Sequence, residues 1–441
     1  MKALVFTTAY PNNVWPNDSV HVRQRVSQFA ALDECGVKVV APVPYFPPLK
    51  ISQKWLFSQV VRQEIIDGIE VYHPKYLMTP KVGMALYGLQ MFLCALSTVR
   101  RVKRSFDFDL ISAHTAYPEG LAGVLLGAYF NKPVVVSARG SDINLLQTFP
   151  LIRQLLRFTL NKADSVIAVS DALKRSMIGL GILDSKISVI PNGVDVKKFR
   201  SFPKEEARNI LGLGSQKLIL SVGNLTANKG FDLLVKAVRA FRVEHPSDNV
   251  QLAIIGEGDC RKSLETLVAS LGLGAHVRLV GAVPHERLYI WYSAADVFCL
   301  ASEREGWPNV LMEALACGIP VIATPVGGIP EIIVSEEIGL LTERQELKIA
   351  AAIRQAFDKQ WRREKIVQYV RAHTWERAAL DMRNVFESTL ACGKKRPAHG
   401  SPRYSHKVKP GSATSSFLEL PCHDPTERLN LTRICEQPGD K

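Results

Sequence analysis

Residues 302–333 read SEREGWPNVLMEALACGIPVIATPVGGIPEII, and they follow the apolar run ADVFCL at residues 295–300. The apolar run is typical of a buried strand, and the Gly and Pro after it predict a loop before a helix that begins near Asn309. Glu305 then lies just before the helix, and Glu313 lies about one turn inside it. Paired glutamates are common on solvated surfaces, but beside a helix N-terminus they can bind hydroxyl groups while the free N–H groups hold a phosphate. The stretch therefore predicts a strand–loop–helix unit that binds a phosphorylated, hydroxyl-rich ligand.

Short apolar runs that alternate with helical stretches extend this pattern along the chain. Each run is continuously apolar, which is typical of parallel strands covered by helices on both faces. The runs fall into two series on either side of the turn signal Pro191-Asn192-Gly193, so we expect an α/β protein with two doubly wound parallel sheets. The expected strands are 2–7, 37–41, 110–113, 133–138, 165–169 and 187–190 in the first series, and 217–222, 251–255, 276–280, 296–300 and 320–323 in the second.

Composition divides the chain into four segments. Residues 1–195 and 196–373 are expected to form the two domains, and residues 374–393 have the pattern of a closing helix. Residues 394–441 are rich in Lys, Arg, Pro, Ser and His without periodicity, which predicts a basic, disordered tail.

The charge balance indicates anionic partners. The 441 residues include 55 Lys and Arg against 42 Asp and Glu, a net charge of +13, and 47% are hydrophobic. Such a composition excludes a wholly disordered, collagen-like or coiled-coil chain. It favours phosphorylated ligands, nucleic acid or an acidic membrane face without choosing among them. None of the eight cysteines forms a CxxC pair, and no Asp-x-Asp cluster follows a strand, so the sequence predicts no metal site.

One uncharged segment bears on the membrane. Residues 82–99 carry no charge and precede Arg100, Arg101, Lys103 and Arg104. The segment can be a buried or domain-surface helix, an interfacial helix with a basic flank, or a membrane-spanning helix, for which its length is barely sufficient.

The stretch at 305–333 resembles the nucleotide-sugar signature of family 4 glycosyltransferases, which have the GT-B fold. Further motifs similar to that family cover about residues 1–391. They are YPNNVWPNDSVHVRQR at 10–25, HTAYPEG at 114–120, PVVVSARGSDI at 133–143, VIAVSDALK at 166–174, ISVIPNGVD at 187–195, SVGNLTANKG at 221–230 and IIGEGD at 254–259. The first of these and the ARGSD motif resemble the branch that builds cell-surface polysaccharides of the teichuronic-acid type.

This resemblance implies two Rossmann-like domains that face a cleft, the first for the acceptor and the second for the nucleotide sugar, with the closing helix returning to the first. It implies catalytic roles for Glu305, which faces the transferred sugar, and for Lys229, which holds the pyrophosphate. It places Glu313 at the donor ribose. The remaining donor contacts that it implies are Gly306, Trp307, Asn309, Val310, Gly256 and Val283.

Three positions depart from the family pattern. Asn224 stands where relatives commonly have an Arg near the pyrophosphate, so charge and a bidentate fork are lost. Arg139 stands where relatives often have a His, and we expect it to act as a catalytic cation that compensates from the first domain. Ser19 stands where relatives often have Gly, close to the donor phosphate.

On the acceptor side the resemblance leaves several alternatives open. His114 either lines the acceptor site or is a structural strand-end residue, and His21 either reaches the cleft or covers the first helix. Asp142 either caps the next helix or orients Arg139. These two histidines are the general-base candidates that an inverting reaction would need.

The resemblance implies a retaining transferase that moves a hexose from a UDP- or GDP-sugar to a glycan or lipid-linked acceptor, and we expect it to work without a metal cofactor. We expect it in the cytoplasm, on the anionic inner face of the membrane, and without nucleic acid as a partner. The alternatives are a nucleotide-sugar epimerase or sugar phosphorylase of the same fold, and an anionic-surface or nucleic-acid-binding protein without catalysis.

Overall fold

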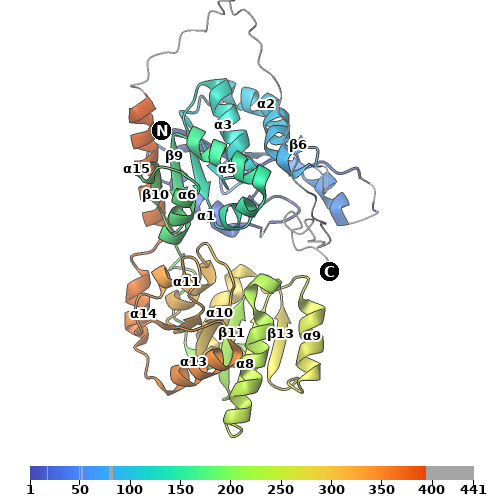
Figure 1. Ribbon diagram of the computed structural model, residues 1–441, viewed down its shortest axis with the longest axis vertical. Coiled ribbons are helices and arrows are strands. Elements are labelled where there is room, and N and C mark those ends of the chain that lie inside the picture. The colour runs from blue at the N-terminus through green and yellow to red at the C-terminus, as the bar shows by residue number, and fades with distance from the viewer. Residues whose placement is uncertain (17, 49, 51–52, 79–82, 394–441) are drawn as a thin grey trace, which may run out of the picture.

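The chain forms two bodies stacked along the long axis of the molecule (Figure 1). The computed structural model describes residues 1–16, 18–48, 50, 53–78 and 83–393. The predicted tail at 394–441 lies outside the described residues. The first sheet with its helices forms the upper body, and the second sheet with its helices forms the lower one.

Eight strands form the first sheet in the order β10-β9-β8-β7-β1-β2-β5-β4, and a small sheet pairs β3 (Val43–Pro44) with β6 (Lys75–Tyr76). The pairs within the eight-stranded sheet are parallel except for the β4–β5 hairpin. The six predicted strands are confirmed, whereas β4 and β5 were not predicted. The strands are β1 (Lys2–Phe6), β2 (Gly36–Val40), β4 (Gln63–Ile66), β5 (Ile69–Tyr72), β7 (Leu110–His114), β8 (Val134–Ala138), β9 (Ser165–Ala168) and β10 (Ile187–Val189).

Helices cover both faces of this sheet, as continuous apolar strands require. One face packs against α2, α3 and α5, and the other packs against α1. The helices are α1 (Val20–Ala30), α2 (Tyr87–Ser105), α3 (Glu119–Phe130), α4 (Ser141–Asn144), α5 (Pro150–Lys162) and α6 (Asp171–Gly179).

The second sheet has six parallel strands in the order β13-β12-β11-β14-β15-β16. They are β11 (Lys217–Val222), β12 (Val250–Ile255), β13 (Val277–Gly281), β14 (Val297–Leu300), β15 (Val321–Ala323) and β16 (Gly339–Leu341). The five predicted strands are confirmed, and β16 is an addition. The helices around this second sheet are α7 (Lys204–Leu211), α8 (Phe231–Glu244), α9 (Arg261–Ser270), α10 (Leu288–Ala294), α11 (Asn309–Ala316), α12 (Ile329–Ile332), α13 (Glu346–Asp358) and α14 (Arg363–Val370).

The chain crosses between the two bodies twice at one place. The backbone N–H of Val194 donates to the carbonyl of His373 at 2.9 Å, and Val194 forms a parallel bridge with Thr374. After this crossing, α15 (Trp375–Gly393) runs along the upper body and packs against α1, with the rings of Phe29 and Phe386 5.2 Å apart (Figure 1). The last helix therefore shares its core with the first sheet.

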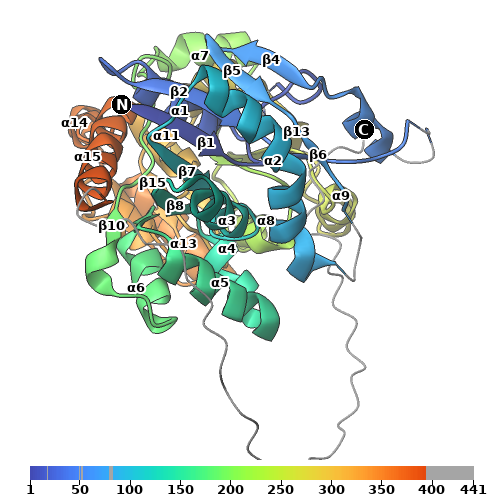
Figure 2. The same ribbon diagram turned by 90° about the horizontal axis from the view of Figure 1, so that it is seen from above.

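The uncharged segment near residue 90 forms α2, which packs against α3 at the edge of the upper body (Figure 2). One side of α2 is buried, and it includes Tyr87, Met91, Ala95 and Val99. In the described part of the chain, no helix combines the length and apolar character needed to span a bilayer. Of the alternatives for this segment, a helix on the surface of the domain agrees with the packing of α2. Contact of α2 with a membrane surface stays a prediction.

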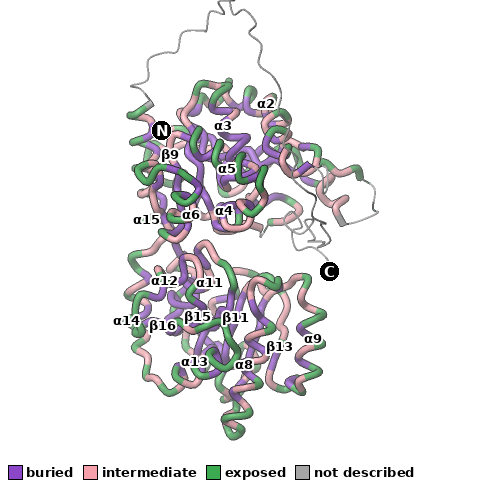
Figure 3. The backbone as a smooth tube through the Cα atoms, in the orientation of Figure 1, coloured by how far each residue is buried: buried purple, intermediate pink, exposed green. Residues whose placement is uncertain are grey.

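Burial follows the sheets. Figure 3 shows buried backbone along the strands and the inward sides of the helices, and exposed backbone on the outer helical turns. The largest apolar cluster continues from the first sheet through Val194 into Leu218 and Trp307 of the second half. The two bodies are therefore joined by packed apolar side chains as well as by the two crossings.

Candidate active site

The two halves touch at the carboxyl ends of their strands, where the loop after β8 meets the loop after β14. A Cβ atom on Gly306 would lie 2.1 Å from the carbonyl oxygen of Arg139, and one on Gly140 would lie 2.8 Å from the Cα of Gly306. A Cβ on Gly327, whose φ is +55°, would lie 1.8 Å from the carbonyl oxygen of Glu305. Glycine is therefore required at these points, because any side chain would push the two loops apart.

Lys229 and Glu305 are brought together from loops after β11 and β14. The Nζ of Lys229 lies 2.7 Å from Oε1 of Glu305, and the hydroxyl of Ser302 donates to the same oxygen at 2.7 Å. Both charged side chains are largely buried, with 23% and 10% of their surface exposed. The pair places one cation and one carboxylate beside the N-terminus of α11, where free N–H groups also attract an anion.

The helix predicted to begin near Asn309 begins there, and Glu313 lies one turn inside it. Its carboxylate is almost fully buried: Nε2 of His285 lies 3.0 Å from Oε1, and the hydroxyl of Tyr292 donates to Oε2 at 2.9 Å. Trp307 is buried just before the helix, and Val310 packs partly buried against the main apolar cluster. The ribose contact expected of Glu313 stays a prediction, since both oxygens already accept hydrogen bonds.

Two glycine-rich loops, after β11 and β12, lie side by side next to the Lys229–Glu305 pair. A Cβ on Gly256 would lie 2.0 Å from the carbonyl oxygen of Gly223, and the N–H of Leu225 donates to the carbonyl of Glu257 at 2.8 Å. Asn224 is exposed at the bend of the first loop. Val283 follows β13 and packs partly buried against the main apolar cluster. The loops thus hold Asn224 and Gly256 close together, as expected of a shared donor surface.

The first half supplies a buried cationic cluster. Arg139 donates through Nη1 to Oδ1 of Asn192 at 3.1 Å and through Nη2 to the ring of His114. Arg25 donates through Nη2 to the same Oδ1 at 3.1 Å and to the carbonyls of residues 190 and 191. Among the described residues, Nε of Arg139 and both Nε and Nη1 of Arg25 are buried without a hydrogen-bond partner. A buried donor without a partner is costly, so this cluster is suited to receive an anionic ligand.

Two neutral imidazoles, those of His21 and His114, lie beside Arg139 and Arg25. Burial, and then the charges of Arg139 and Arg25, lower the pKa of His21 to about 3 and hold the pKa of His114 well below its ordinary value. Burial lowers the pKa of Arg139 to about 10, so its guanidinium stays charged at neutral pH.

His114 does not line an acceptor surface in this structure, because its side chain is fully buried against Arg139 and Ser112. The strand-end structural alternative describes it better, and its place is to position Arg139. His21 is half-buried, and the charges of Arg139 and Arg25 both act on it. His21 therefore lies beside the cationic cluster.

Asp142 holds the loop that carries Arg139. Its Oδ1 accepts the backbone N–H groups of Arg139 at 2.9 Å and Gly140 at 2.8 Å, and Oδ2 accepts that of Ala116 at 2.6 Å. The carboxylate is thus a backbone anchor, which orients Arg139 through its main chain. Burial raises its pKa.

Ser19 precedes α1 with φ 48° and ψ 38°, a left-handed conformation that favours glycine. The family pattern of Gly at this position therefore has a backbone reason here, and Ser19 occupies it with strain.

Sequence reasoning missed four residues of the site, because their partners lie far away in the chain. Asn192 joins Arg25 and Arg139, and its Nδ2 donates to Oδ1 of Asn309 in the other half at 3.0 Å. Glu331 accepts two N–H groups at the start of α6 across the same boundary, both at 2.8 Å. Arg25 and His285 were also not singled out. The Pro191-Asn192-Gly193 turn was the available signal for Asn192, and it was interpreted only as the break between the two series of strands.

Two doubly wound sheets whose carboxyl ends meet across glycine-rich loops are the arrangement of the GT-B fold. The family model for "Glycosyltransferase Family 4" matches residues 61–198, and the model for "Glycosyl transferases group 1" matches residues 203–373.

Individual proteins give the same result. The chain is 30% identical over 373 residues to the Bacillus subtilis protein assigned as teichuronic acid biosynthesis glycosyltransferase TuaC, which covers 82% of this chain and 91% of the relative. It is 28% identical over 282 residues, 62% of this chain and 70% of the relative, to the GDP-mannose-dependent alpha-(1-6)-phosphatidylinositol monomannoside mannosyltransferase of Mycolicibacterium smegmatis. The solved structure of Anabaena Alr3699/HepE in complex with UDP-glucose superposes with a TM-score of 0.65 at 21% identity, covering 88% of this chain and 100% of that one.

The chain therefore belongs to the family 4 glycosyltransferases of group 1 type, and it has the GT-B fold.

Proposed function

We propose that this protein transfers a hexose from a nucleotide sugar, such as a UDP- or GDP-sugar, to a glycan or lipid-linked acceptor in cell-surface polysaccharide synthesis. The relatives support this proposal: one is named as a teichuronic acid biosynthesis glycosyltransferase, one is named as GDP-mannose-dependent, and one was solved in complex with UDP-glucose.

The observation that carries the proposal is the Lys229–Glu305 pair at 2.7 Å beside the N-terminus of α11. A departing nucleoside diphosphate gains negative charge, and a fixed ammonium group with aligned helix N–H groups stabilises it in the transition state. Glu305 then accepts hydroxyls of the transferred sugar when the diphosphate takes over Lys229. These groups supply the stabilising charge from the protein itself, so we propose a transfer that needs no metal ion.

Arg139 is proposed to complete the diphosphate site from the opposite half. Its backbone touches Gly306, its guanidinium is charged, and its Nε has no partner within the described residues. Asn224 provides an amide where relatives carry an Arg, so this cation offsets the lost charge.

Retention of configuration is part of the proposal, and the same groups support it. Glu305 is paired with Lys229, and Asp142 accepts three backbone N–H groups, so neither carboxylate is placed as a free nucleophile. We therefore propose attack on the same face that the diphosphate leaves, with the leaving phosphate accepting the proton of the acceptor hydroxyl. His21, neutral at physiological pH, is the remaining base candidate for the inverting alternative.

The test is to incubate the purified protein with single nucleotide sugars, first alone and then with a lipid-linked glycan acceptor, and to resolve the products by NMR. Without an acceptor, a transferase hydrolyses the nucleotide sugar slowly. With the acceptor, a retaining transferase forms a product whose new glycosidic bond has the same anomeric configuration as the donor. An epimerase converts the donor without acceptor, and a sugar phosphorylase requires inorganic phosphate, so either result would replace this proposal.

We place the protein in the cytoplasm, on the anionic inner face of the membrane. The last turn of α2 carries Lys103 and Arg104, and each basic residue near anionic lipid contributes about 1 kcal/mol. Release of the protein from membrane fractions by salt is the expected result, and retention at high salt would contradict peripheral attachment.

A further inference from the structure

The first half contains a cavity of about 270 Å³ that the proposed chemistry does not use. It opens at the carboxyl ends of β1, β2 and β7, where ligands of doubly wound sheets bind. Its lining contains an apolar group of residues and a hydrogen-bonded polar group, and this difference indicates which kind of ligand the cavity binds.

One part of the wall is apolar. It includes three methionines, Met78, Met84 and Met91, and the pair Trp15 and Phe57, whose rings are tilted at 51° to each other with centroids 4.7 Å apart. Flexible thioethers adapt to irregular apolar shapes. A hydrocarbon chain buried against these side chains leaves no hydrogen-bonding group of its own without a partner. This part of the wall therefore favours a flexible hydrocarbon chain.

Another part of the wall is polar. The hydroxyls of Thr8 and Thr115 donate to the two oxygens of the buried Glu119. Asp142 also lines this wall, and it holds the Arg139-Gly140 turn that touches Gly306. The polar wall thus adjoins the contact between the two halves, where transfer is proposed to occur.

We propose that this cavity, the chain pocket, binds the first part of the hydrocarbon chain of a lipid-linked acceptor, with the acceptor's polar end against Thr8, Thr115 and Asp142. The inference rests on the proposed transferase function and narrows its acceptor class from glycans in general to molecules with an isoprenoid or acyl chain. The polar wall directs the reactive hydroxyl toward the Arg139–Gly306 contact while the chain anchors the molecule.

The probes are methyl and n-hexyl glucoside, the second used below its micelle-forming concentration. They share one head group, so the ratio of their affinities isolates the chain. Each fully buried methylene contributes a factor of about 4. We expect hexyl glucoside to bind the wild-type protein at least about tenfold more tightly than methyl glucoside in calorimetry.

The matched variants are Met84→Glu and Leu86→Glu. Met84 lines the cavity, whereas Leu86, two residues later, is 53% exposed and does not appear in the cavity wall. The preference for the hexyl chain should fall below about threefold in Met84→Glu and persist in Leu86→Glu. Trp15→Ala truncates another side chain of the same lining. It should also lower the preference for the hexyl chain, and it replaces Met84→Glu if that variant does not fold.

Equal affinities for the two glucosides in the wild-type protein would overturn the inference, as would a preference that survives both pocket variants. Loss of the preference in Leu86→Glu as well would place the chain on the helix surface instead and also overturn it. Binding of nucleotide sugars is measured on the same samples. Failure of that binding with an intact chain preference would sink the proposed function, and the reverse pattern would sink only the chain pocket.

Discussion

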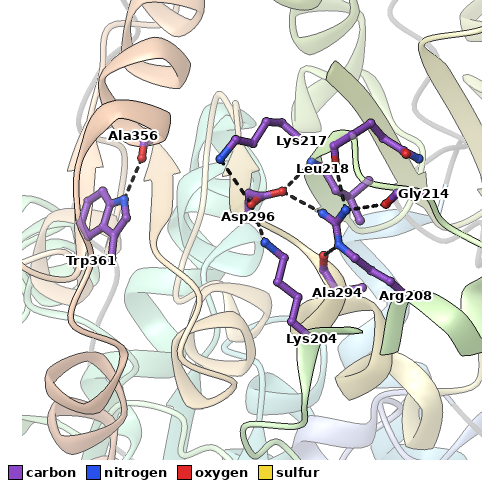
Figure 4. A network of polar contacts seen from close by, with 10 residues as sticks. Lys204, Arg208, Gly214, Lys217, Leu218, Ala294, Asp296, Ala356 and Trp361 are labelled. Atoms are coloured by element: carbon purple, nitrogen blue, oxygen red, sulfur yellow. Dashed lines mark hydrogen bonds and ion pairs between the residues drawn. The ribbon is translucent and has the colours of Figure 1, made fainter. Parts of the chain in front are cut away.

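Two buried arginine networks, one in each half, differ in how their charge is balanced. In the second half, Arg208 of α7 donates Nη2 to the carboxylate of Asp296 at 2.9 Å (Figure 4). Its Nε and Nη1 donate to the carbonyls of Ala294, Gly214 and Gln216 at 2.7–3.1 Å. Every nitrogen of this guanidinium has a partner, and the network ties α7 to the start of the sheet.

In the first half, Arg25 and Arg139 share the single amide oxygen of Asn192, and their other bonds go to carbonyls and an imidazole. Three of their nitrogens have no partner among the residues that the structure describes. Buried cations whose guanidinium groups form no ion pair are costly, and of the residues described only the charge of Asp142 acts favourably on Arg139. The contrast separates a network whose every donor is satisfied from a cluster with unsatisfied donors, for which we propose an anionic ligand.

Breaking the balanced network should have the largest effect. Asp296→Ala leaves Arg208 and Lys204 without their shared carboxylate, which accepts from Lys204 at 2.6 Å. Loss of one partner of a buried pair typically costs about 3–5 kcal/mol. We expect a loss of this size in the free energy of unfolding, measured by urea denaturation. Glu343→Ala, in the exposed pair with Lys348, should change it by less than about 1 kcal/mol, and an equal loss in both variants would contradict the comparison.

Removing a cation from the unbalanced cluster should act on turnover instead. Arg139→Ala is expected to lower kcat/KM by about 10²–10³-fold, as does loss of a single group that stabilises developing charge. The free energy of unfolding should change by no more than about 1 kcal/mol, because Asp142 keeps the three backbone N–H groups that satisfy its carboxylate. Arg139→Lys keeps the charge but not the fork, so an intermediate rate is expected. Wild-type turnover in Arg139→Ala would show that the cluster has no catalytic role.

The same cluster predicts a pH dependence of stability. His21 and His114 have folded pKa values far below the unfolded value near 6.5, so the unfolded chain binds protons that the folded chain does not. Stability is therefore complete above about pH 6.5 and falls on acidification, by up to roughly 1 kcal/mol per pH unit for each imidazole. His21→Asn should show a shallower decline in urea denaturation between pH 6.5 and 5. An unchanged slope would mean that His21 is not held neutral.

A smaller effect is expected beside the cluster, at the start of α1. Ser19 has a left-handed backbone that costs a non-glycine residue about 1 kcal/mol. Ser19→Gly should therefore raise the unfolding free energy by several tenths to about 1 kcal/mol, less the greater flexibility of the unfolded chain. Ser27→Gly, in the interior of the same helix, should instead lower it. A destabilising Ser19→Gly would argue against the strain.

The sequence was sufficient for the two sheets, because every strand in their centres is a continuous apolar run. It was insufficient at the edges: β4 and β5 contain polar residues, and the Asp67-Gly68 turn between them was the hairpin signal that was not used. β16 is three residues long and begins with Gly339, so only two apolar residues mark it in the sequence.

The donor half of the site was predictable because its residues lie in one motif or in loops that follow adjacent strands. Lys229 and Glu305, 76 residues apart, were both identified and lie in contact. The cationic cluster was not, since Arg25 and Asn192 are 167 residues apart and meet only after folding. His114 was identified as a candidate acceptor-site residue, but its position at the end of a strand could not reveal that its side chain is buried.

The most direct test of this account is calorimetry of UDP-, GDP-, ADP- and dTDP-linked hexoses with the wild-type protein and the variants Lys229→Ala and Arg139→Ala, all in EDTA. We predict that one donor class binds the wild-type protein in EDTA and that each substitution weakens it at least about tenfold. Absence of binding by every donor, binding that EDTA abolishes, or binding that both variants retain in full would contradict the assignment of the cations to the diphosphate.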